Sequence, residues 1–372
     1  MNRPLVLAGA GHAHLVTLRN WIDRGFRPPA GTLLVNPTPA AWYSGMMPGL
    51  LAGRFSAADC AIDLAPLCRA CDIELYMGKI QALDADARSL SLTDGTQLDY
   101  QRLSLNTGSI PPLPEVRDNS VALLPAKPFP KLHQTWTAWQ QPTSTAPTCV
   151  AILGGGPAAF ELALALRASL PATDVVLISA SRLLASHPAA LIARAQRLLR
   201  QRGVRLIEQQ KITRIYHGQL FNGDQPLLLC EAVVAATGAS APDWLRGSGL
   251  AVDTDGFARI GKSLISTSHP EVFATGDCAS LPGALRSGVY AVRQGAFLAD
   301  NILGQLQGTA LRHYQPQRQA LALLATADGG ALMSYGRWVA SGRLMGWWKD
   351  RLDIGFMQRH RISLEQTHGH RH

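Results

Sequence analysis

The chain has 372 residues, more than one ordinary hydrophobic core organises and enough for two domains. Its 47% hydrophobic and 16% charged residues exclude a disordered protein. The net charge of +9 attracts anions such as nucleotides, but no zinc-finger or RNA-recognition pattern accompanies it, so we expect no nucleic-acid partner.

Nothing at the start of the sequence resembles a signal peptide, and no apolar run is long enough to span a membrane. The six cysteines show no disulfide-framework spacing. In a chain of this length they are typical of buried thiols in a reducing compartment, so we expect a cytoplasmic protein.

The first predicted unit is a strand, a glycine turn and a helix. Residues 4–9 read as a buried parallel strand, residues 12–24 as a helix, and residues 32–35 as the next strand. In such a unit Gly9 makes the tight turn and Gly11 lets the backbone approach a pyrophosphate, which the helix N-terminus then binds. The third glycine of the usual fingerprint is replaced by His14. His12 and His14 do not share a helix face and have no assignable further ligand, so we predict no metal site.

A second unit of the same kind begins about 145 residues later. Residues 148–153 form its strand, Gly154 to Ala159 its turn and residues 174–179 its next strand. Two such fingerprints in context predict two nucleotide-binding domains. Strands ending at Thr107-Gly108 and Thr237-Gly238 follow the two units, and a later strand ends at Thr275-Gly276-Asp277.

These features together resemble the two-dinucleotide-binding-domain flavoproteins, the pyridine nucleotide-disulfide oxidoreductase superfamily. Three motifs most resemble flavoproteins associated with selenide, water dikinase, which are similar to type II NADH dehydrogenases and sulfide:quinone reductases; they are residues 11–15, 43–49 and 289–295. The resemblance implies an α/β fold of two Rossmann-like domains, the second inserted in the first, with a small C-terminal α+β region. The expected boundaries are 1–112 and 268–310 for the FAD domain, 113–267 for the NAD(P) domain and 311–372 for the C-terminal region.

The resemblance also implies where FAD binds. The first turn would face the pyrophosphate, Asn36 would meet the adenosine ribose in place of the usual acid, and Ile80 would lie along the adenine. Asp277 would bond the ribityl or pyrophosphate part, or would simply be a turn residue. The helix beginning near Val289 and Tyr290 would direct its N-terminus at the flavin. The expected FAD-binding residues are Gly9, Gly11, His12, Ala13, His14, Asn36, Gly45, Met46, Ile80, Thr107, Gly108, Gly276, Asp277, Val289 and Tyr290.

The second turn would receive a nicotinamide dinucleotide, or the domain would have kept its fold and lost this ligand. Ser179 stands where an acid would select NAD, and Arg182 follows it, which favours NADPH slightly over NADH. The expected contacts are Gly154, Gly156, Pro157, Ala158, Ser179, Arg182 and Gly238.

Two further residues are catalytic candidates by the resemblance. Glu161 would relay protons near the flavin, although a carboxylate early in a helix is also favoured by the helix dipole alone. Lys127 would approach flavin N5. The methionines at 46 and 47 exclude a flavin–disulfide relay at that position, and Cys68 and Cys71 read as structural thiols.

The C-terminal region reads as a hairpin, residues 320–326 and 331–336, followed by a helix. Leu344, Trp348, Leu352 and Phe356 recur at four-residue steps with basic neighbours. Residues 343–361 would contact a membrane interface or a quinone, or would pack on the flavin domain or a second subunit. The protein would then lie at the inner face of the membrane.

We therefore predict an enzyme, an FAD-dependent oxidoreductase that takes hydride from NAD(P)H and reduces an unidentified acceptor. A quinone or a selenium or sulfur species are the candidate acceptors. The alternative is a flavin-containing partner or sensor protein that associates with selenide, water dikinase and turns over little NAD(P)H.

Overall fold

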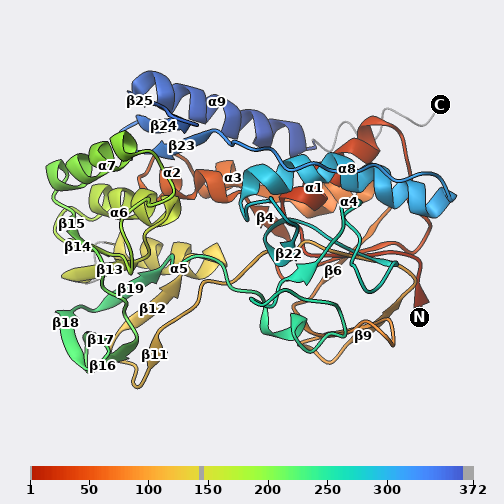
Figure 1. Ribbon diagram of the computed structural model, residues 1–372, viewed down its shortest axis with the longest axis horizontal. Helices are drawn as coiled ribbons and strands as arrows, with labels where there is room; N and C mark the ends of the chain where they lie inside the picture. Colours follow the sequence, from red (N-terminus) through yellow and green to blue (C-terminus); the bar gives the residue numbers. More distant parts are fainter. Residues whose placement is uncertain (1, 142–145, 363–372) are drawn as a thin grey trace.

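The computed structural model describes residues 2–141 and 146–362, which form two parallel sheets flanked by helices and a C-terminal layer above them (Figure 1). The histidines at positions 368, 370 and 372, which by sequence could bind a metal adventitiously, lie outside the described residues. The described helices are α1 (His12–Asp23), α2 (Met47–Leu51), α3 (Ala57–Cys60), α4 (Leu64–Ala70), α5 (Phe129–Trp139), α6 (Pro157–Ser169), α7 (Ala189–Gln201), α8 (Gly288–Gln307) and α9 (Arg343–His360).

The first sheet has the strand order of a Rossmann fold. Its order across the sheet is β21 (Val272–Ala274), β10 (Leu103–Leu105), β2 (Val6–Ala8), β3 (Leu33–Asn36) and β6 (Glu74–Met77), and every pairing is parallel. The order reverses between β2 and β10. Ligands of such sheets bind beyond the carboxyl ends of the strands at this reversal.

The second sheet repeats this plan with its own reversal between β13 and β19. Its order is β12 (Ala122–Pro125), β19 (Ala232–Ala235), β13 (Cys149–Leu153), β14 (Asp174–Ile178) and β15 (Arg205–Ile207), again all parallel. The chain leaves the first sheet after β10 and returns to it only at β21. The second Rossmann-like unit is thus inserted in the first, while the domain boundaries at 112, 268 and 310 remain predictions.

Smaller sheets complete the two units. One contains β1 (Asn2–Arg3), β9 (Gln97–Tyr100), β8 (Ser89–Leu92) and β7 (Ile80–Asp84), and another contains β11 (Glu115–Val116), β16 (Arg214–Tyr216), β17 (Gln219–Asn222) and β18 (Gln225–Leu229). Two-stranded pairs join β4 (Ala40–Trp42) to β5 (Ala61–Asp63) and β20 (Ala258–Arg259) to β22 (Ala279–Ser280).

The C-terminal region is a three-stranded antiparallel sheet followed by α9. The predicted hairpin is confirmed as β23 (Ala322–Ala325) and β24 (Ala331–Tyr335), and a third strand, β25 (Trp338–Gly342), was not predicted. Both α6 and α7 contact this sheet, and α9 packs across it and also contacts α1. The C-terminal region therefore lies over both dinucleotide-binding units (Figure 1).

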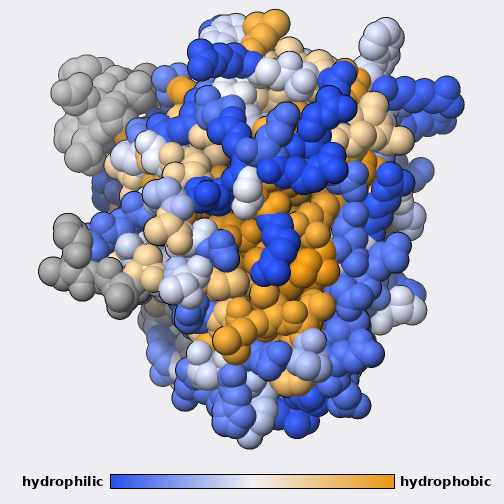
Figure 2. Space-filling model, turned by 90° about the vertical axis from the view of Figure 1, so that its left-hand side faces the viewer, coloured by the Kyte–Doolittle hydropathy of each residue, from blue (hydrophilic) through white to orange (hydrophobic). Residues whose placement is uncertain are grey.

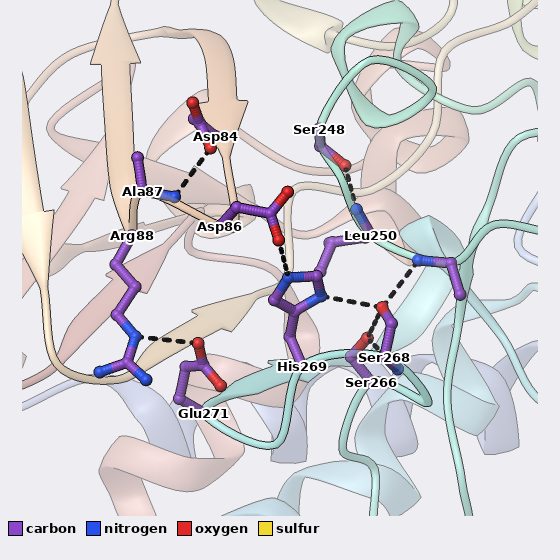
Figure 3. A network of polar contacts seen from close by, with 11 residues as sticks. Asp84, Asp86, Ala87, Arg88, Ser248, Leu250, Ser266, Ser268, His269 and Glu271 are labelled. Atoms are coloured by element: carbon purple, nitrogen blue, oxygen red, sulfur yellow. Dashed lines mark hydrogen bonds and ion pairs between the residues drawn. The ribbon is translucent and has the colours of Figure 1, made fainter.

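A polar network fastens the loop before β21 to the β7–β8 hairpin (Figure 3). His269 Nε2 lies 3.1 Å from Asp86 Oδ1, and His269 Nδ1 lies 2.9 Å from Ser268 Oγ. This order of acid, histidine and serine resembles a hydrolase triad. However, Ser268 Oγ also accepts a hydrogen bond from the amide of Ala251 at 2.8 Å. The serine oxygen is thus engaged with the backbone, and the network fixes loops where the chain re-enters the first sheet.

Candidate active site

The first crevice is formed by the turn after β2 and the segment after β10. A Cβ at Gly9, whose φ is +88°, would lie 2.6 Å from the carbonyl oxygen of Asn106, so no other residue fits there without backbone movement. A Cβ at Gly11 would lie 2.3 Å from Asn106 Oδ1. The space that Gly11 leaves is therefore used by Asn106 as well as by any pyrophosphate.

Asn106, which the sequence did not single out, joins the strands that border this crevice. Its Oδ1 accepts from the amide of His14 at 3.2 Å, and its Nδ2 donates to the carbonyl of Thr275 at 2.9 Å. The amides of His12 and Ala13 have no acceptor among the described residues, and α1 has no side-chain cap. They are the donors that a helix N-terminus offers to a phosphate.

The two histidines of the first turn have different roles. His14 is fully buried, with Nδ1 2.5 Å from the carbonyl oxygen of Gly9 and Nε2 2.8 Å from Ser104 Oγ. Burial lowers the pKa of His14 to about 4, and the bond to Gly9 opposes this only in part. The His14 ring thus lies between α1 and the sheet, where Ser104 of β10 contacts it.

His12 lies at the mouth of the crevice against Tyr43 and Phe356, with ring centroids 5.2 and 5.7 Å away. Burial lowers the pKa of His12 to about 4, with Asp277 opposing and Lys127 adding to this effect. His12 is consequently neutral at physiological pH and can offer one donor and one acceptor.

Asn36 stands at the end of β3, where the ribose was expected, but both its polar atoms already have partners. Its Oδ1 accepts from the amide of Ala10 at 3.0 Å, and its Nδ2 donates to the carbonyl of Thr38 at 2.7 Å. A ribose contact would have to share these atoms. Ile80, expected along the adenine, begins β7 beside this edge of the sheet.

Lys127 and Asp277, both expected from the family resemblance, lie side by side. Lys127 Nζ donates to Asp277 Oδ2 at 2.9 Å, and the Ser109 hydroxyl lies 3.5 Å from the same oxygen. Thr107 Oγ1 is buried without a hydrogen-bond partner in the described part of the chain. An unpartnered buried hydroxyl beside an acid–lysine pair fits a polar ligand in this crevice.

The start of α8 also faces this region. Gly288 lies close to the His12 ring, because a Cβ there would be 3.6 Å from His12 Nε2. The amide of Tyr290 is already bonded to Ser287, and its hydroxyl donates to the carbonyl of Gln317, so Tyr290 anchors the helix and Val289 is the more exposed residue. Together the glycine cradle, the free amides and the orphan hydroxyl fit FAD.

The second crevice repeats the first with more open space. A Cβ at Gly154 would lie 2.1 Å from the carbonyl oxygen of Ala236, whereas a Cβ at Gly156 would meet no atom within 4 Å. Pro157 opens α6, and the amide of Ala158 has no acceptor among the described residues. This turn therefore fits a dinucleotide pyrophosphate. Gly238, with φ of +108°, follows β19 on the other side of the reversal.

The two residues expected to select the nicotinamide dinucleotide differ in exposure. Ser179 is fully buried under Gly155, whose Cβ would lie 2.2 Å from the serine oxygen, and Ser179 Oγ accepts from the amide of Ser181. Arg182 is exposed. The cationic side chain, and not the hydroxyl, is thus the group available to a ligand.

Glu161 lies in the first turns of α6, beneath the C-terminal sheet. Its Oε1 accepts a hydrogen bond from the amide of Ala325 in β23 at 2.7 Å. Burial raises the pKa of Glu161 to about 7, although Lys349 and the bond from Ala325 oppose this. A carboxyl group with this pKa both holds and releases a proton near neutral pH.

The sequence did not identify the partners of Glu161, which come from α9 and from the segment after β4. Lys349 Nζ donates to Asp353 Oδ2 and to the carbonyl of Gly45, both at 2.9 Å. The Tyr43 hydroxyl donates to Asp353 Oδ1 at 3.1 Å. Burial opposes the charge on Lys349, but Glu161 and Asp353 together raise its pKa, while burial and Asp353 raise the pKa of Tyr43. Gly45 and Met46, in the turn Ser44–Met46, thus adjoin a buried charged cluster.

The described residues do not indicate redox chemistry at Cys68 and Cys71 or a metal site. Burial raises the pKa of Cys68 and of Cys71 to about 12, which keeps both as protonated thiols. No group of three metal-binding side chains occurs among residues 2–141 and 146–362. Within the same residues, no helix is both long and apolar enough to cross a bilayer.

Comparisons with known proteins agree with this geometry. Residues 6–295 match the family model described as pyridine nucleotide-disulphide oxidoreductase. The chain is 24% identical over 338 residues to the NADH dehydrogenase-like protein YutJ of Bacillus subtilis, covering 87% of this chain and 90% of that one. It is 25% identical over 295 residues to ferroptosis suppressor protein 1 of Taeniopygia guttata, covering 74% and 72%.

Among solved structures, the sulfide:quinone oxidoreductase of Aquifex aeolicus superposes with a TM-score of 0.77 at 15% identity, covering 96% of this chain and 91% of that one. That likeness concerns the fold. The family match, the two glycine cradles and the uncapped helices lead to one conclusion: the chain belongs to the pyridine nucleotide-disulphide oxidoreductase family and is an oxidoreductase that uses FAD and NAD(P)H.

Proposed function

We propose that this protein oxidises NAD(P)H and reduces a quinone-like acceptor, with Glu161 delivering a proton to that acceptor. FAD, when bound, would supply the redox chemistry by accepting hydride from NAD(P)H and passing two electrons to the acceptor. In total, NAD(P)H, one proton and a quinone give NAD(P)⁺ and a quinol. The observation that carries the proposal is the buried Glu161 carboxyl, which accepts a hydrogen bond from the amide of Ala325 and whose pKa burial raises to about 7.

The surrounding residues would keep Glu161 supplied with protons and correctly placed. The amide of Ala325 fixes one carboxyl oxygen. Lys349, held by Asp353 and Gly45, stabilises the carboxylate after the proton has left. In the first crevice, the Lys127–Asp277 pair would hold the polar part of FAD. Lys127, Glu161 and the two glycine turns thus form the proposed site.

The test begins with anaerobic reduction of the flavin by NADH and NADPH, titrated separately. Both are expected to bleach it, with NADPH favoured because Arg182 suits a 2′-phosphate. Turnover with a short-chain ubiquinone should then fall about a hundredfold in Glu161→Gln, while turnover with ferricyanide, which takes no proton, stays within about twofold. An equal loss with both acceptors would show that Glu161 acts on flavin reduction or folding instead.

A second proposal concerns contact with a membrane surface. The outer face of α9 exposes Leu344 (69%), Trp347 (58%) and Leu352 (49%), interleaved with arginines. An interfacial helix has this composition. Sedimentation with vesicles should detect binding that Leu344→Gln/Trp347→Gln removes; truncation of α9 would be a poor test because it also removes Lys349.

The resemblance to flavoproteins associated with selenide, water dikinase rests on sequence motifs alone. We propose a selenium or sulfur species as the alternative class of acceptor on that basis. Anaerobic reoxidation of the reduced enzyme by selenite or polysulfide, compared with ubiquinone, separates the two classes. A partner or sensor role for the protein would be favoured only if neither acceptor reoxidised the flavin.

A further inference from the structure

A pocket of about 500 Å³ lies between α7 and the C-terminal sheet, away from both dinucleotide crevices. The helix contributes side chains from the side that adjoins the sheet, and the sheet contributes β24, the end of β25 and the turn before β24. The first residue of α9 closes one side. The lining includes Arg194, Arg197, Thr326, Asp328, Ser341 and Arg343.

The charges in this pocket are unbalanced. Its one acid, Asp328, is bound by Arg202 and also accepts from Thr326 and Gly330. Arg194 makes only long contacts, 3.4 Å to the carbonyl of Val339 and 3.5 Å to the Ser341 hydroxyl. Within residues 2–141 and 146–362, Arg197 and Arg343 form no side-chain hydrogen bond and no ion pair.

Three guanidinium groups without a carboxylate partner suit a phosphate. Arginine presents fixed pairs of N–H donors that match two phosphate oxygens, and its charge persists at any physiological pH. The pocket volume admits a phosphate with a small polar substituent, and Ser341 adds a hydroxyl.

The position of the pocket beside exposed apolar side chains indicates that the phosphate belongs to a lipid headgroup. Arg343 lines the pocket, and the next exposed side chains along α9 are Leu344 and Trp347, while Trp338 in β25 is 79% exposed. In Figure 1 the start of α9, β25 and α7 lie together at the left end of the molecule. Figure 2 faces this end, and hydrophilic residues fill much of its upper part, with apolar residues at the top edge and in the centre. A surface that binds anionic lipid combines apolar side chains that enter the bilayer with arginines at the level of the headgroups.

We propose that this arginine pocket binds the phosphate headgroup of an anionic lipid and orients the protein on the membrane. The proposal rests on the membrane contact of α9 put forward above, and it adds α7 of the second unit to that contact. It predicts a preference for anionic vesicles that depends on particular arginines, and not on the net charge of +9 alone.

The experiment uses the full-length holoprotein and vesicles of phosphatidylcholine with or without phosphatidylglycerol. Each basic residue near an anionic surface contributes about fivefold in binding, so Arg194→Gln/Arg197→Gln should weaken binding to phosphatidylglycerol vesicles roughly thirtyfold. The charge-matched control is Arg200→Gln/Arg205→Gln, on the same helix and the adjoining strand but outside the pocket, and it should lose no more than about threefold.

The outcomes separate this proposal from the membrane contact and from the proposed activity. Equal weakening in the two double variants would overturn the pocket and leave a general charge effect. Wild-type protein that binds both vesicle types equally would overturn it even if Leu344→Gln/Trp347→Gln abolishes binding. A further outcome is that glycerol phosphate in solution binds the pocket while substitution of Arg194 and Arg197 leaves vesicle binding unchanged. In that case the ligand is a soluble phosphate and the lipid proposal is wrong. Binding is measured without turnover, so failure of the proposed reaction does not affect the result.

Discussion

The Glu161→Gln substitution should change how the free energy of unfolding depends on pH, whatever the electron acceptor is. The surroundings raise the Glu161 pKa from 4.5 to about 7, which corresponds to ~3 kcal/mol between the two protonation states. Because the folded-state pKa lies above the unfolded one, the folded protein binds more protons in this range. The contribution of Glu161 to stability is complete below about pH 4.5 and is lost as the pH rises through about 7.

The measurement is chemical denaturation of wild type and Glu161→Gln, without nicotinamide, at several pH values from 5 to 9. Glutamine keeps the oxygen that accepts from Ala325 but does not titrate. Between these limits wild type should lose up to ~3 kcal/mol more than the variant, with the steepest change between the two pKa values of 4.5 and about 7 and a plateau at higher pH. Glu231→Gln is the control, because hydrogen bonds from Thr148 and Cys149 lower the pKa of Glu231 and move its titration to acid pH. Parallel pH profiles for wild type and Glu161→Gln would refute the assignment of a neutral-range pKa.

Three further predictions follow from the turns. His14→Gly should lower the free energy of unfolding by about 2–4 kcal/mol, because it leaves a cavity and removes both ring hydrogen bonds. The folded variant should still show the absorbance of bound FAD. If the variant lost FAD without losing stability, the His14 ring would be a cofactor contact. Gly154→Ala should abolish flavin reduction by NAD(P)H or prevent folding, since its Cβ would meet the Ala236 carbonyl at 2.1 Å; an active variant would contradict this packing. Arg182→Gln should reduce kcat/KM for NADPH about tenfold and leave NADH unchanged, and equal effects on both would exclude 2′-phosphate recognition.

Local sequence signals predicted the two Rossmann units well. Each depends on a strand, a glycine turn and a helix within about 30 contiguous residues, and the residue types required by the turn are visible in the sequence. Gly9 and Gly154 both stand where a Cβ would strike the neighbouring strand end. The role of Asn106 was missed, because its partners His14 and Thr275 are 92 and 169 residues away and no local pattern marks it.

The same limit applies to the cluster around Glu161. Lys349 and Asp353 bond to residues some 300 positions earlier, Gly45 and Tyr43, so only the folded chain shows the connection. A weak signal existed, since a lysine and an aspartate four residues apart interrupt an otherwise apolar and arginine-rich helix.

The four-residue repeat of α9 marks an exposed face at the start of the helix but not at its end. Leu344, Trp348 and Leu352 do share the outer face, but Phe356 stacks on Tyr43 with ring centroids 4.7 Å apart. Four residues turn an α-helix by about 400°, so a four-residue repeat drifts by ~40° at each step and by ~120° between Leu344 and Phe356. The drift carries Phe356 from the outer face to the rings beside His12.

This geometry gives α9 two faces with different surroundings. Its inner face places Lys349 and Asp353 beside Glu161, and its outer face carries Leu344, Trp347 and the arginines. The faces meet within single turns, because Lys349 follows Trp347 and Trp348 directly. A surface that bound the outer face would therefore hold the inner side chains at the proposed acceptor site without touching them. In the proposed function, membrane contact and proton delivery would thus be joined by one helix, which carries a buried lysine as well as exposed apolar side chains.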